Sequence, residues 1–551
     1  MTSRNLKIRA ATGRARRSAA DWAGPHIRLA RMRRDPVVWL IAIAGGFGIA
    51  GAAIAFRELI GLIQIPWLLN RSEYVITAAA SVPWWLIVAG PAAGGAIVGV
   101  ILTWAMPGRR AEAVADVIEA HAIGGSHIPL RRGLISAAIS AISLGSGASA
   151  GREGPVVHLG ASLASSLARA FNLPAAARRT ILACGVAAAV SASFNVPIAG
   201  VLFAHEVILG HYALSAFVPI VLSSVCAAVV SRAYYGDFSA FFVPSYHINS
   251  YWEFPAFALL GLTCAVVAIA FQFAVTGADV AARKVHVPLW LRPIIGGLAV
   301  GGIGVFLPHI LGVGYQATDM ALTARLPLAL MLTLIVVKTA ATAITMASRF
   351  GGGVFSPALY LGAMTGGAFG IIAAAIAPDL ASSGGLYAIL GMGAVAAAVL
   401  GAPISTTMIV FELTGGLALS IALLLAVSVA SAATQLVHAR SFFHWQLGMR
   451  GLFLDEGPHK RLVRSLKVSD FMRVSGEDED ARAFDPEGGD PWLTPTDTIE
   501  SALRAFDASG VSRIAVIDEN EATLRLGWAL HVDALAVFNA ALIEASEEEH
   551  R

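Results

Sequence analysis

The stretch "SLGSGASAGREGPVVHLG", residues 143–160, places two charged side chains in the middle of a long run of small and apolar residues. Arg152 and Glu153 stand side by side, and the pair Gly154–Pro155 follows them. Proline suits the first turn of a helix, where the N–H that it lacks would have no acceptor. The stretch therefore predicts a helix that begins at this glycine-rich turn and carries a carboxylate at its start.

The composition around this stretch is that of a membrane protein. Of 551 residues, 56% are apolar and only 14% are charged, whereas a soluble domain has about 25% charged residues. Apolar runs of about 20 residues are long enough to cross a bilayer, and they recur up to residue 440: Val37–Phe56, Trp84–Met106, Phe254–Val275, Leu326–Met346 and Leu417–Val437. The sequence predicts an all-α polytopic membrane protein in the lipid bilayer. The net charge of +3 gives no sign of a nucleic-acid partner.

The first 34 residues are strongly basic. They hold ten Lys or Arg residues against one acid, Asp21. The positive-inside rule places such a segment in the cytoplasm, and a solvated disordered tail is an equally good interpretation of residues 1–20. No short apolar core with a cleavage site follows, so we do not expect a secretory signal. We expect a multi-pass protein of the cell (inner) membrane with both termini in the cytoplasm.

An internal repeat organises the membrane region. The segment "GREGPVVHLGA" (151–161) aligns with "GVFSPALYLGA" (353–363), and "GVAAAVSASFNVPIAGVLFAHE" (185–206) aligns with "GMGAVAAAVLGAPISTTMIVFE" (391–412). The two offsets, 202 and 206 residues, nearly agree, which favours duplicated halves over chance similarity. Duplicated halves with Gly- and Pro-interrupted helices are typical of transporters, whose substrate sites lie where the repeats meet.

The repeat also suggests a ligand. Gly151–Pro155 and Gly353–Pro357 read as two helix N-termini inside the membrane, and free amides at the positive end of a helix dipole bind anions. A carboxylate at such a place competes with the anion for the same amides and leaves when it is protonated. An intramembrane acid is a functional candidate by default, which makes Glu153 a gate. The alternative is an ion pair of Arg152 with Glu153 at the membrane surface.

Four motifs together resemble the CLC family of chloride channels and transporters. They are "GSGASAGREGP" (145–155), "FNVPIAGVLFAHE" (194–206), "GGGVFSPALYLG" (351–362) and "GAPISTTMIVFELT" (401–414). With the apolar runs between them, the likeness covers residues 35–450.

This resemblance implies a homodimer with one chloride (or similar monovalent anion) pathway in each subunit and about 18 helices in two inverted-topology repeats. It implies that Glu153 is the gating and proton-accepting glutamate. It also implies that the anion is bound near the backbone amides of Gly151, Arg152, Gly154, Val354 and Phe355.

Two positions depart from the family at the central anion. The family usually has a serine there about 39 residues before "GREGP", and counting back leads to Glu112, or to Ala111 or Ala113 after a slip of one. We expect Glu112 to be turned away or protonated, because a carboxylate would repel the anion. The family tyrosine of the last membrane helix corresponds to Phe443, which we expect at the anion site without a hydroxyl.

A third departure concerns protons. Family exchangers usually carry an inner glutamate where this chain has Val207. The chain therefore resembles a passive channel, and a proton-coupled chloride antiporter is the alternative. In that case Glu206, one residue earlier, is a candidate for the proton path.

The tail, residues 451–551, is polar and reads as a small α/β unit in the cytoplasm. A helix at 496–509 with Thr496 or Asp497 as N-cap, two strands at 513–518 and 523–530, and a helix at 531–546 resemble a single or degenerate CBS motif. We expect "KVSDFM" (467–472) as its lead-in strand.

An alternative of another class is a membrane sensor regulated by nucleotide binding to this tail. No catalytic acid pair or metal-ligand cluster stands out from the sequence. Its three cysteines lie in apolar runs without metal-ligand spacing. We predict no enzyme activity, no metal and no cofactor.

Overall fold

The computed structural model describes residues 35–71, 73–123, 125–236, 241, 246–414, 419–438, 441–453, 466–474, 489–519, 521 and 523–550. The predicted basic N-terminus (1–34) lies outside these residues.

The membrane region is built of helices joined by turns and loops. In chain order its helices are α2 (Asp35–Leu68), α3 (Val75–Ala79), α4 (Trp84–Trp104), α5 (Val114–Ala122), α6 (Leu130–Gly145), α7 (Glu153–Ala170), α8 (Ala175–Phe194), α9 (Pro197–Phe203), the π-helix η1 (Ala204–Leu209), α10 (Leu214–Tyr235), the 3-10 turn η2 (Tyr251–Glu253), α11 (Phe254–Lys284), α12 (Arg292–Phe306), the 3-10 turn η3 (Pro308–Ile310), α13 (Tyr315–Leu322), α14 (Leu328–Ala347), α15 (Phe355–Ile376), α16 (Gly384–Leu400), α17 (Pro403–Thr414), α18 (Ser420–Val437) and α19 (Phe442–Gly448).

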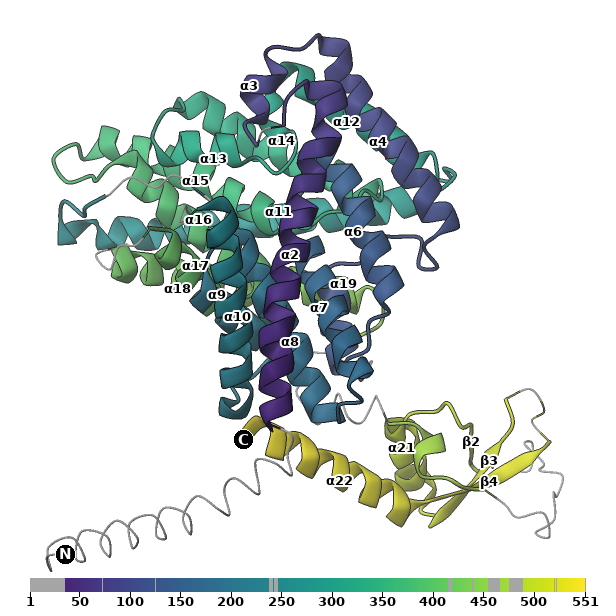
Figure 1. Ribbon diagram of the computed structural model, residues 1–551. Helices are drawn as coiled ribbons and strands as arrows, with labels where there is room; N and C mark the ends of the chain where they lie inside the picture. The colour runs from purple at the N-terminus through teal and green to yellow at the C-terminus, as the bar shows by residue number, and fades with distance from the viewer. Residues whose placement is uncertain are drawn as a thin grey trace, which may run out of the picture.

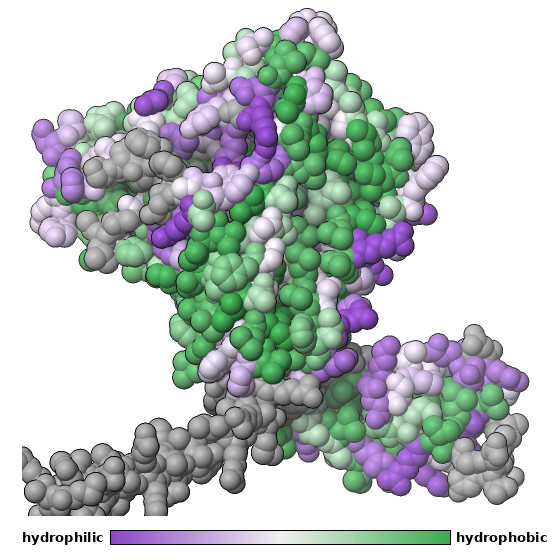
Figure 2. Space-filling view, viewed as in Figure 1, coloured by the Kyte–Doolittle hydropathy of each residue, from purple (hydrophilic) through white to green (hydrophobic). Residues whose placement is uncertain are grey.

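The helices of this region range from 34 residues in α2 to five in α3. Within the described residues, eight helical segments are long and apolar enough to cross a bilayer, which confirms the predicted polytopic membrane protein. Helix α2 runs along one face of the membrane region, beside α10 (Figure 1). Hydrophobic residues cover most of the lower part of this face, and hydrophilic residues gather in its upper part (Figure 2).

The two halves of the chain meet at a pair of glycines. Gly151 and Gly353, equivalent in the repeat, form an isolated antiparallel bridge. The N–H of each donates to the carbonyl oxygen of the other, at 2.7 Å from Gly151 and 2.8 Å from Gly353. Equivalent residues that exchange hydrogen bonds in this way are related by a local twofold axis, so the bridge joins the two repeats in inverted orientation. Helices α7 and α15 begin two residues after it.

The second repeated segment folds into the same shape in both halves. Asn195 directly follows α8 and Gly401 directly follows α16, and both are in the left-handed backbone region, with φ of 62° and 67°. Gly and Asn tolerate this conformation best, and it commonly ends a helix. A proline then begins the next helix, at Pro197 in α9 and Pro403 in α17.

Two carboxylates fasten these short helices to each other. Glu206, at the end of the first half, accepts hydrogen bonds from the first amides of α17, and Glu412, on α17, accepts them from the first amides of α9. The bonds come from Ile404 N (3.0 Å) and Ser405 N (2.7 Å) to Glu206, and from Ile198 N (3.0 Å) and Ala199 N (2.7 Å) to Glu412. Each half therefore neutralises the N-terminus of a helix in the other half.

The tail forms a small unit with its own core. Strands β1 (Arg473–Val474), β2 (Trp492–Leu493), β3 (Arg513–Ile517) and β4 (Arg525–Leu530) form a sheet in the order β1-β4-β3-β2, with β2 and β3 parallel and the other pairs antiparallel. Helices α21 (Ile499–Ser509) and α22 (His531–His550) accompany it. The core includes the buried side chains of Val468, Phe506, Ile514 and Val516.

Two details of the tail differ from the prediction. The N-cap of α21 is Thr498, which accepts from the Ser501 N–H, and not Thr496 or Asp497. The Asp497 carboxylate accepts from the Thr494 N–H instead. The segment "KVSDFM" forms the 3-10 turn η5 (Val468–Asp470) and not a strand. Its assignment as part of a CBS-like motif stays a prediction.

We predict that the crossed carboxylates stabilise the contact between the halves. Replacing Glu206 or Glu412 with Ala leaves two helix-start amides without an acceptor, so the free energy of unfolding should fall by roughly 2 kcal/mol for each. Reversible denaturant titration in mixed micelles measures this loss. Asp379→Ala, which removes an exposed carboxylate from a loop, is the matched control. Equal stability of all three variants would show that the crossed contacts do not hold the repeats together.

Candidate functional site: an anion pathway

Glu153 is the first residue of α7 and is buried, with 2% of its surface exposed. The turn before it leaves room for its side chain: a Cβ at Gly151 would lie 2.8 Å from Glu153 Oε2. Pro155 takes the third helical position, where a missing N–H is harmless. The sequence "GREGP" thus places a carboxylate inside the protein at a helix start, as predicted from the sequence.

Two hydroxyl groups from the second half of the chain hold this carboxylate. The Tyr315 hydroxyl, at the start of α13, donates to Oε1 at 2.7 Å, and the Ser356 hydroxyl, in the first turn of α15, donates to Oε2 at 2.6 Å. Hydrogen bonds to a carboxylate are stronger than those between neutral groups. Neither partner could be predicted from the sequence, because Tyr315 and Ser356 lie 162 and 203 residues away from Glu153.

The Arg152 side chain is directed toward Glu73 and Tyr315 and not toward the first amides of α7. Its guanidinium bonds to the Glu73 carboxylate and lies over the Tyr315 ring, 4.7 Å from the centroid. Its Nε is 3.8 Å from Glu153 Oε1, so the predicted Arg152–Glu153 contact exists only as a longer ion pair. Arg57 donates two hydrogen bonds to the same Glu73 carboxylate, at 2.8 and 2.9 Å. The positive charge of Arg152 is therefore balanced by the carboxylate of Glu73.

A cavity of about 320 Å³, called the outer cavity below, lies beside Arg152. Arg152 and Tyr315 are in its wall, together with Arg57, Arg71 and Glu73. The wall also contains residues 312–314, the turn that leads into α13.

A second, central cavity of about 20 Å³ lies between the two helix starts. That volume holds one water-sized occupant. Its wall contains the predicted anion-site residues Gly154, Val354, Phe355 and Phe443. The first amides of a helix have no acceptor within the helix, and among the described residues the N–H groups of Gly154, Val354 and Phe355 have no other backbone acceptor.

Two of the predicted anion ligands lie elsewhere. The Gly151 N–H is occupied by the carbonyl oxygen of Gly353, so it is not free for an anion in this conformation. Arg152 contributes to the outer cavity and is not in the wall of the central one.

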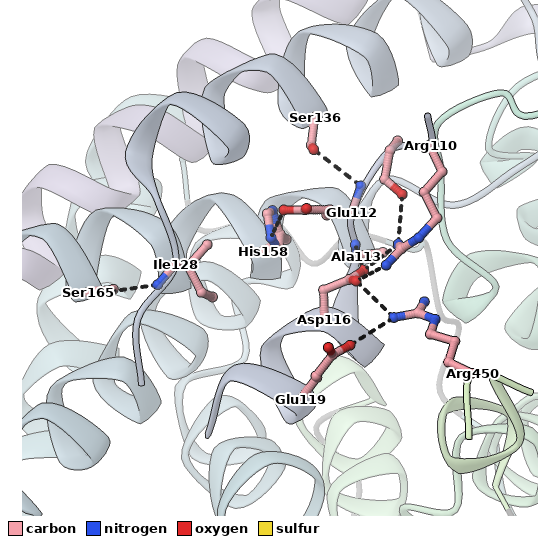
Figure 3. A network of polar contacts seen from close by, with 11 residues as sticks. Arg110, Glu112, Ala113, Asp116, Glu119, Ile128, Ser136, His158, Ser165 and Arg450 are labelled. Atoms are coloured by element: carbon pink, nitrogen blue, oxygen red, sulfur yellow. Dashed lines mark hydrogen bonds and ion pairs between the residues drawn. The ribbon is translucent and has the colours of Figure 1, made fainter. Parts of the chain in front are cut away.

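Glu112 is turned away from the pathway, which was one of the two outcomes expected for it. Its carboxylate lies 3.3 Å from Nε2 of the buried His158, and its N–H donates to the Ser136 hydroxyl (Figure 3). The neighbouring Ala113 takes the place in the wall of the central cavity. Neither the serine nor the tyrosine hydroxyl of the family is present there, since Ala113 and Phe443 occupy the two positions.

Arginines fix the segment that carries Ala113. Asp116, in the first turn of α5, accepts hydrogen bonds from the guanidinium groups of Arg110 and Arg450, and from the Ala113 N–H at 2.8 Å (Figure 3). Arg450 also reaches Glu119 at 3.1 Å. The start of α5 is thereby tied to the end of the membrane region, and Ala113 stays at the central cavity.

Gln446 is the functional candidate that the sequence reasoning missed. It lies one helical turn after Phe443 on α19 and is the one polar side chain in the described wall of the central cavity. Its carboxamide N–H groups are hydrogen-bond donors suited to an anion. The sequence could have indicated it, because a residue three positions after Phe443 on a helix lies on the same face.

A third cavity of about 530 Å³, called the inner mouth below, shares Ala113, Gly352 and Gln446 with the central one. Six arginines and two aspartates are in its wall: Arg109, Arg110, Arg283, Arg292, Arg349, Arg450, Asp116 and Asp279. The excess of positive charge attracts anions to this mouth.

The predicted proton-path residues lie outside the walls of these three cavities. Glu206 accepts hydrogen bonds from the start of α17, as described above. Val207 is buried in the π-helix η1, with 8% of its surface exposed. Glu206 thus binds the first amides of α17. Its part in proton movement stays a prediction.

Comparison with known proteins agrees with this architecture. The sequence model of the family described as voltage gated chloride channel matches residues 94–435, well over half of the chain. A putative chloride channel protein, ClcB-like, of Ralstonia nicotianae is 33% identical over 381 residues, which cover 68% of this chain and 89% of the relative. The voltage-gated ClC-type chloride channel ClcB of Escherichia coli is 29% identical over 417 residues, 75% of this chain and 98% of the relative.

Two solved structures share the fold. A slow cyanobacterial Cl⁻/H⁺ antiporter superposes with a TM-score of 0.67 at 20% identity, over 75% of this chain and 97% of the other. A CLC-type fluoride/proton antiporter superposes with a TM-score of 0.61 at 21% identity, over 74% and 97%. The chain therefore belongs to the voltage gated chloride channel family, the CLC family, whose members are membrane channels and transporters and not enzymes.

Proposed function

We propose that this protein carries a small monovalent anion, chloride in the first place, through a pathway in each subunit that Glu153 opens and closes. The observation that carries the proposal is the position of Glu153 between two cavities. The residue before it, Arg152, is in the wall of the outer cavity, and the residue after it, Gly154, is in the wall of the central cavity. The Glu153 carboxylate is held by Tyr315, which is in the wall of the outer cavity, and by Ser356, so we infer that it stands between the two cavities.

The binding of the anion rests on backbone and amide donors. The N–H groups of Gly154, Val354 and Phe355 and the carboxamide of Gln446 surround the central cavity, and no lysine or arginine is in its described wall. A fixed positive charge would hold the anion too tightly, whereas conduction needs release as well as binding. The arginines of the inner mouth raise the local anion concentration without contacting the central site.

Passive movement is the favoured form. Val207 has no titratable group, and Glu206 is engaged at the start of α17. The described residues therefore offer no free carboxylate at the inner proton position of family exchangers. Proton-coupled exchange is the second candidate, because both of the solved structures compared above are described as proton antiporters.

We place the protein in the inner membrane as a homodimer, with the termini in the cytoplasm. The basic segment 1–34 supports this orientation through the positive-inside rule. The resemblance to CLC proteins supports the dimer. A nucleotide at the tail stays a separate prediction.

The first prediction concerns the gate. Glu153→Gln imitates the protonated carboxyl, so chloride efflux from liposomes should become nearly independent of pH, whereas efflux through the wild-type protein should rise on acidification. Asp379→Asn, at an exposed loop carboxylate, should keep the wild-type profile. If efflux through Glu153→Gln still follows pH as the wild type does, Glu153 is not the sensor.

The second prediction separates the two forms of transport. Liposomes with an outward chloride gradient and no pH gradient should develop no sustained uphill proton movement, because passive flux leaves protons uncoupled. A pH-sensitive dye measures this, and the reversal potential under combined chloride and pH gradients gives any stoichiometry. Sustained proton pumping that Glu153→Ala abolishes would establish exchange in place of passive flux.

A further inference from the structure

Lys338 is a lysine buried inside a membrane-spanning helix. It lies on α14, and none of its surface is exposed. Its ammonium group donates to the carbonyl oxygens of Ile310, at 3.1 Å, and Gly312, at 3.0 Å. It also lies 5.2 Å from the centroid of the Tyr360 ring. Within the described part of the chain, its contacts are thus two carbonyl dipoles and an aromatic ring, and not a carboxylate.

A charge in this position is costly. Removing an ammonium from water is repaid only where the surroundings satisfy it well, and two carbonyls and a ring compensate it less than an acid would. A methionine or leucine would fill the same space on α14 without this cost. Ionisable residues inside membrane segments usually serve function.

The carbonyls that Lys338 binds belong to the turn before α13. This turn is fastened on its other side as well, since the Gly312 N–H donates to the carbonyl oxygen of Gly147 at 3.2 Å. Gly314 ends the turn with φ of +94°, and a Cβ there would lie 2.8 Å from the Tyr360 ring. The turn is therefore held in place by contacts with α14, with α15 and with residues 145–147.

The same turn leads directly into the gate. Tyr315 follows Gly314 and donates to Glu153 Oε1 at 2.7 Å, while its ring lies under the Arg152 guanidinium. Residues 312–315 are in the wall of the outer cavity. A shift of the turn would move the Tyr315 hydroxyl relative to Glu153.

We propose that Lys338 is a positioning residue of the gate, which holds the turn 310–314 so that the Tyr315 hydroxyl stays bonded to the Glu153 carboxylate. This inference rests on the proposed function, because it assumes that Glu153 gates the flux. Lys338 itself does not touch the anion.

Groups other than Lys338 also face the gate or stand near it. Arg152 and the Tyr315 hydroxyl face Glu153 directly, and Glu73 with Arg57 stands behind Arg152. From α15, Ser356 faces Glu153 with a neutral hydroxyl, and the Tyr360 ring faces Lys338.

The test measures the pH at which chloride efflux is half-maximal in Lys338→Met. Releasing Tyr315 removes a donor from the carboxylate, so protonation and opening should occur at higher pH. We expect an upward shift of about one pH unit, the effect of losing one hydrogen bond to a charged group. Tyr315→Phe should shift the midpoint in the same direction. The double variant should shift no further than Tyr315→Phe alone.

Controls separate this inference from the function on which it rests. Lys284→Met, at the exposed end of α11, should keep the wild-type midpoint. If Lys338→Met does not fold, Gly314→Ala displaces the same turn from the Tyr360 side and should give the same upward shift. An unchanged midpoint in the variant that folds, or a Lys338→Met shift that adds in full to that of Tyr315→Phe, would overturn the inference. If chloride efflux through the wild-type protein does not depend on pH, or if efflux through Glu153→Gln still does, the proposed function is overturned instead.

Discussion

The reciprocal hydrogen bonds between Gly151 and Gly353 are the constraint on which the pathway depends. They bring two helix N-termini, from halves of the chain separated by about 200 residues, to the same point inside the membrane. The backbones touch closely, since a Cβ at Gly154 would lie 3.3 Å from the Gly353 Cα. Larger residues would force α7 and α15 apart, and the amides that follow the bridge would no longer converge on one cavity. The glycines of "GREGP" and "GGGVF" are required for this approach.

Among the described residues, no charged side chain is in the wall of the central cavity. Arg152 is drawn to Glu73, Glu112 to His158, and the carboxylate of Glu153 to two hydroxyl groups. The central cavity is consequently surrounded by backbone amides, apolar side chains and the carboxamide of Gln446. Partial charges suffice to stabilise a dehydrated anion there and still allow it to leave. The hydrogen bonds to the Glu153 carboxylate come from two neutral hydroxyl groups, and Arg152 reaches it only at 3.8 Å.

The sequence predicts those parts of the site that depend on local chain geometry. Gly and Pro mark helix starts because they act on the backbone of their own turn, so the starts of α7 and α15, the repeat and the position of Glu153 follow from the order of residues. Phe443 at the central cavity followed from the family resemblance. What the sequence does not show are contacts between distant segments, such as Tyr315 and Ser356 on Glu153, Glu73 on Arg152, or Lys338 on the turn before α13. The small differences in the tail have a local cause, because Thr498, Asp497 and Thr496 are all competent N-caps and packing decides among them.

The central claim is that an anion binds between the two helix starts. Anomalous X-ray diffraction from crystals grown in bromide tests it most directly, because bromide scatters anomalously and replaces chloride. The account predicts a bromide peak in the central cavity, within hydrogen-bonding distance of the Gly154, Val354 or Phe355 amides, and stronger in Glu153→Gln than in the wild type. Bromide bound only among the arginines of the inner mouth, with the central cavity empty in both proteins, would contradict it.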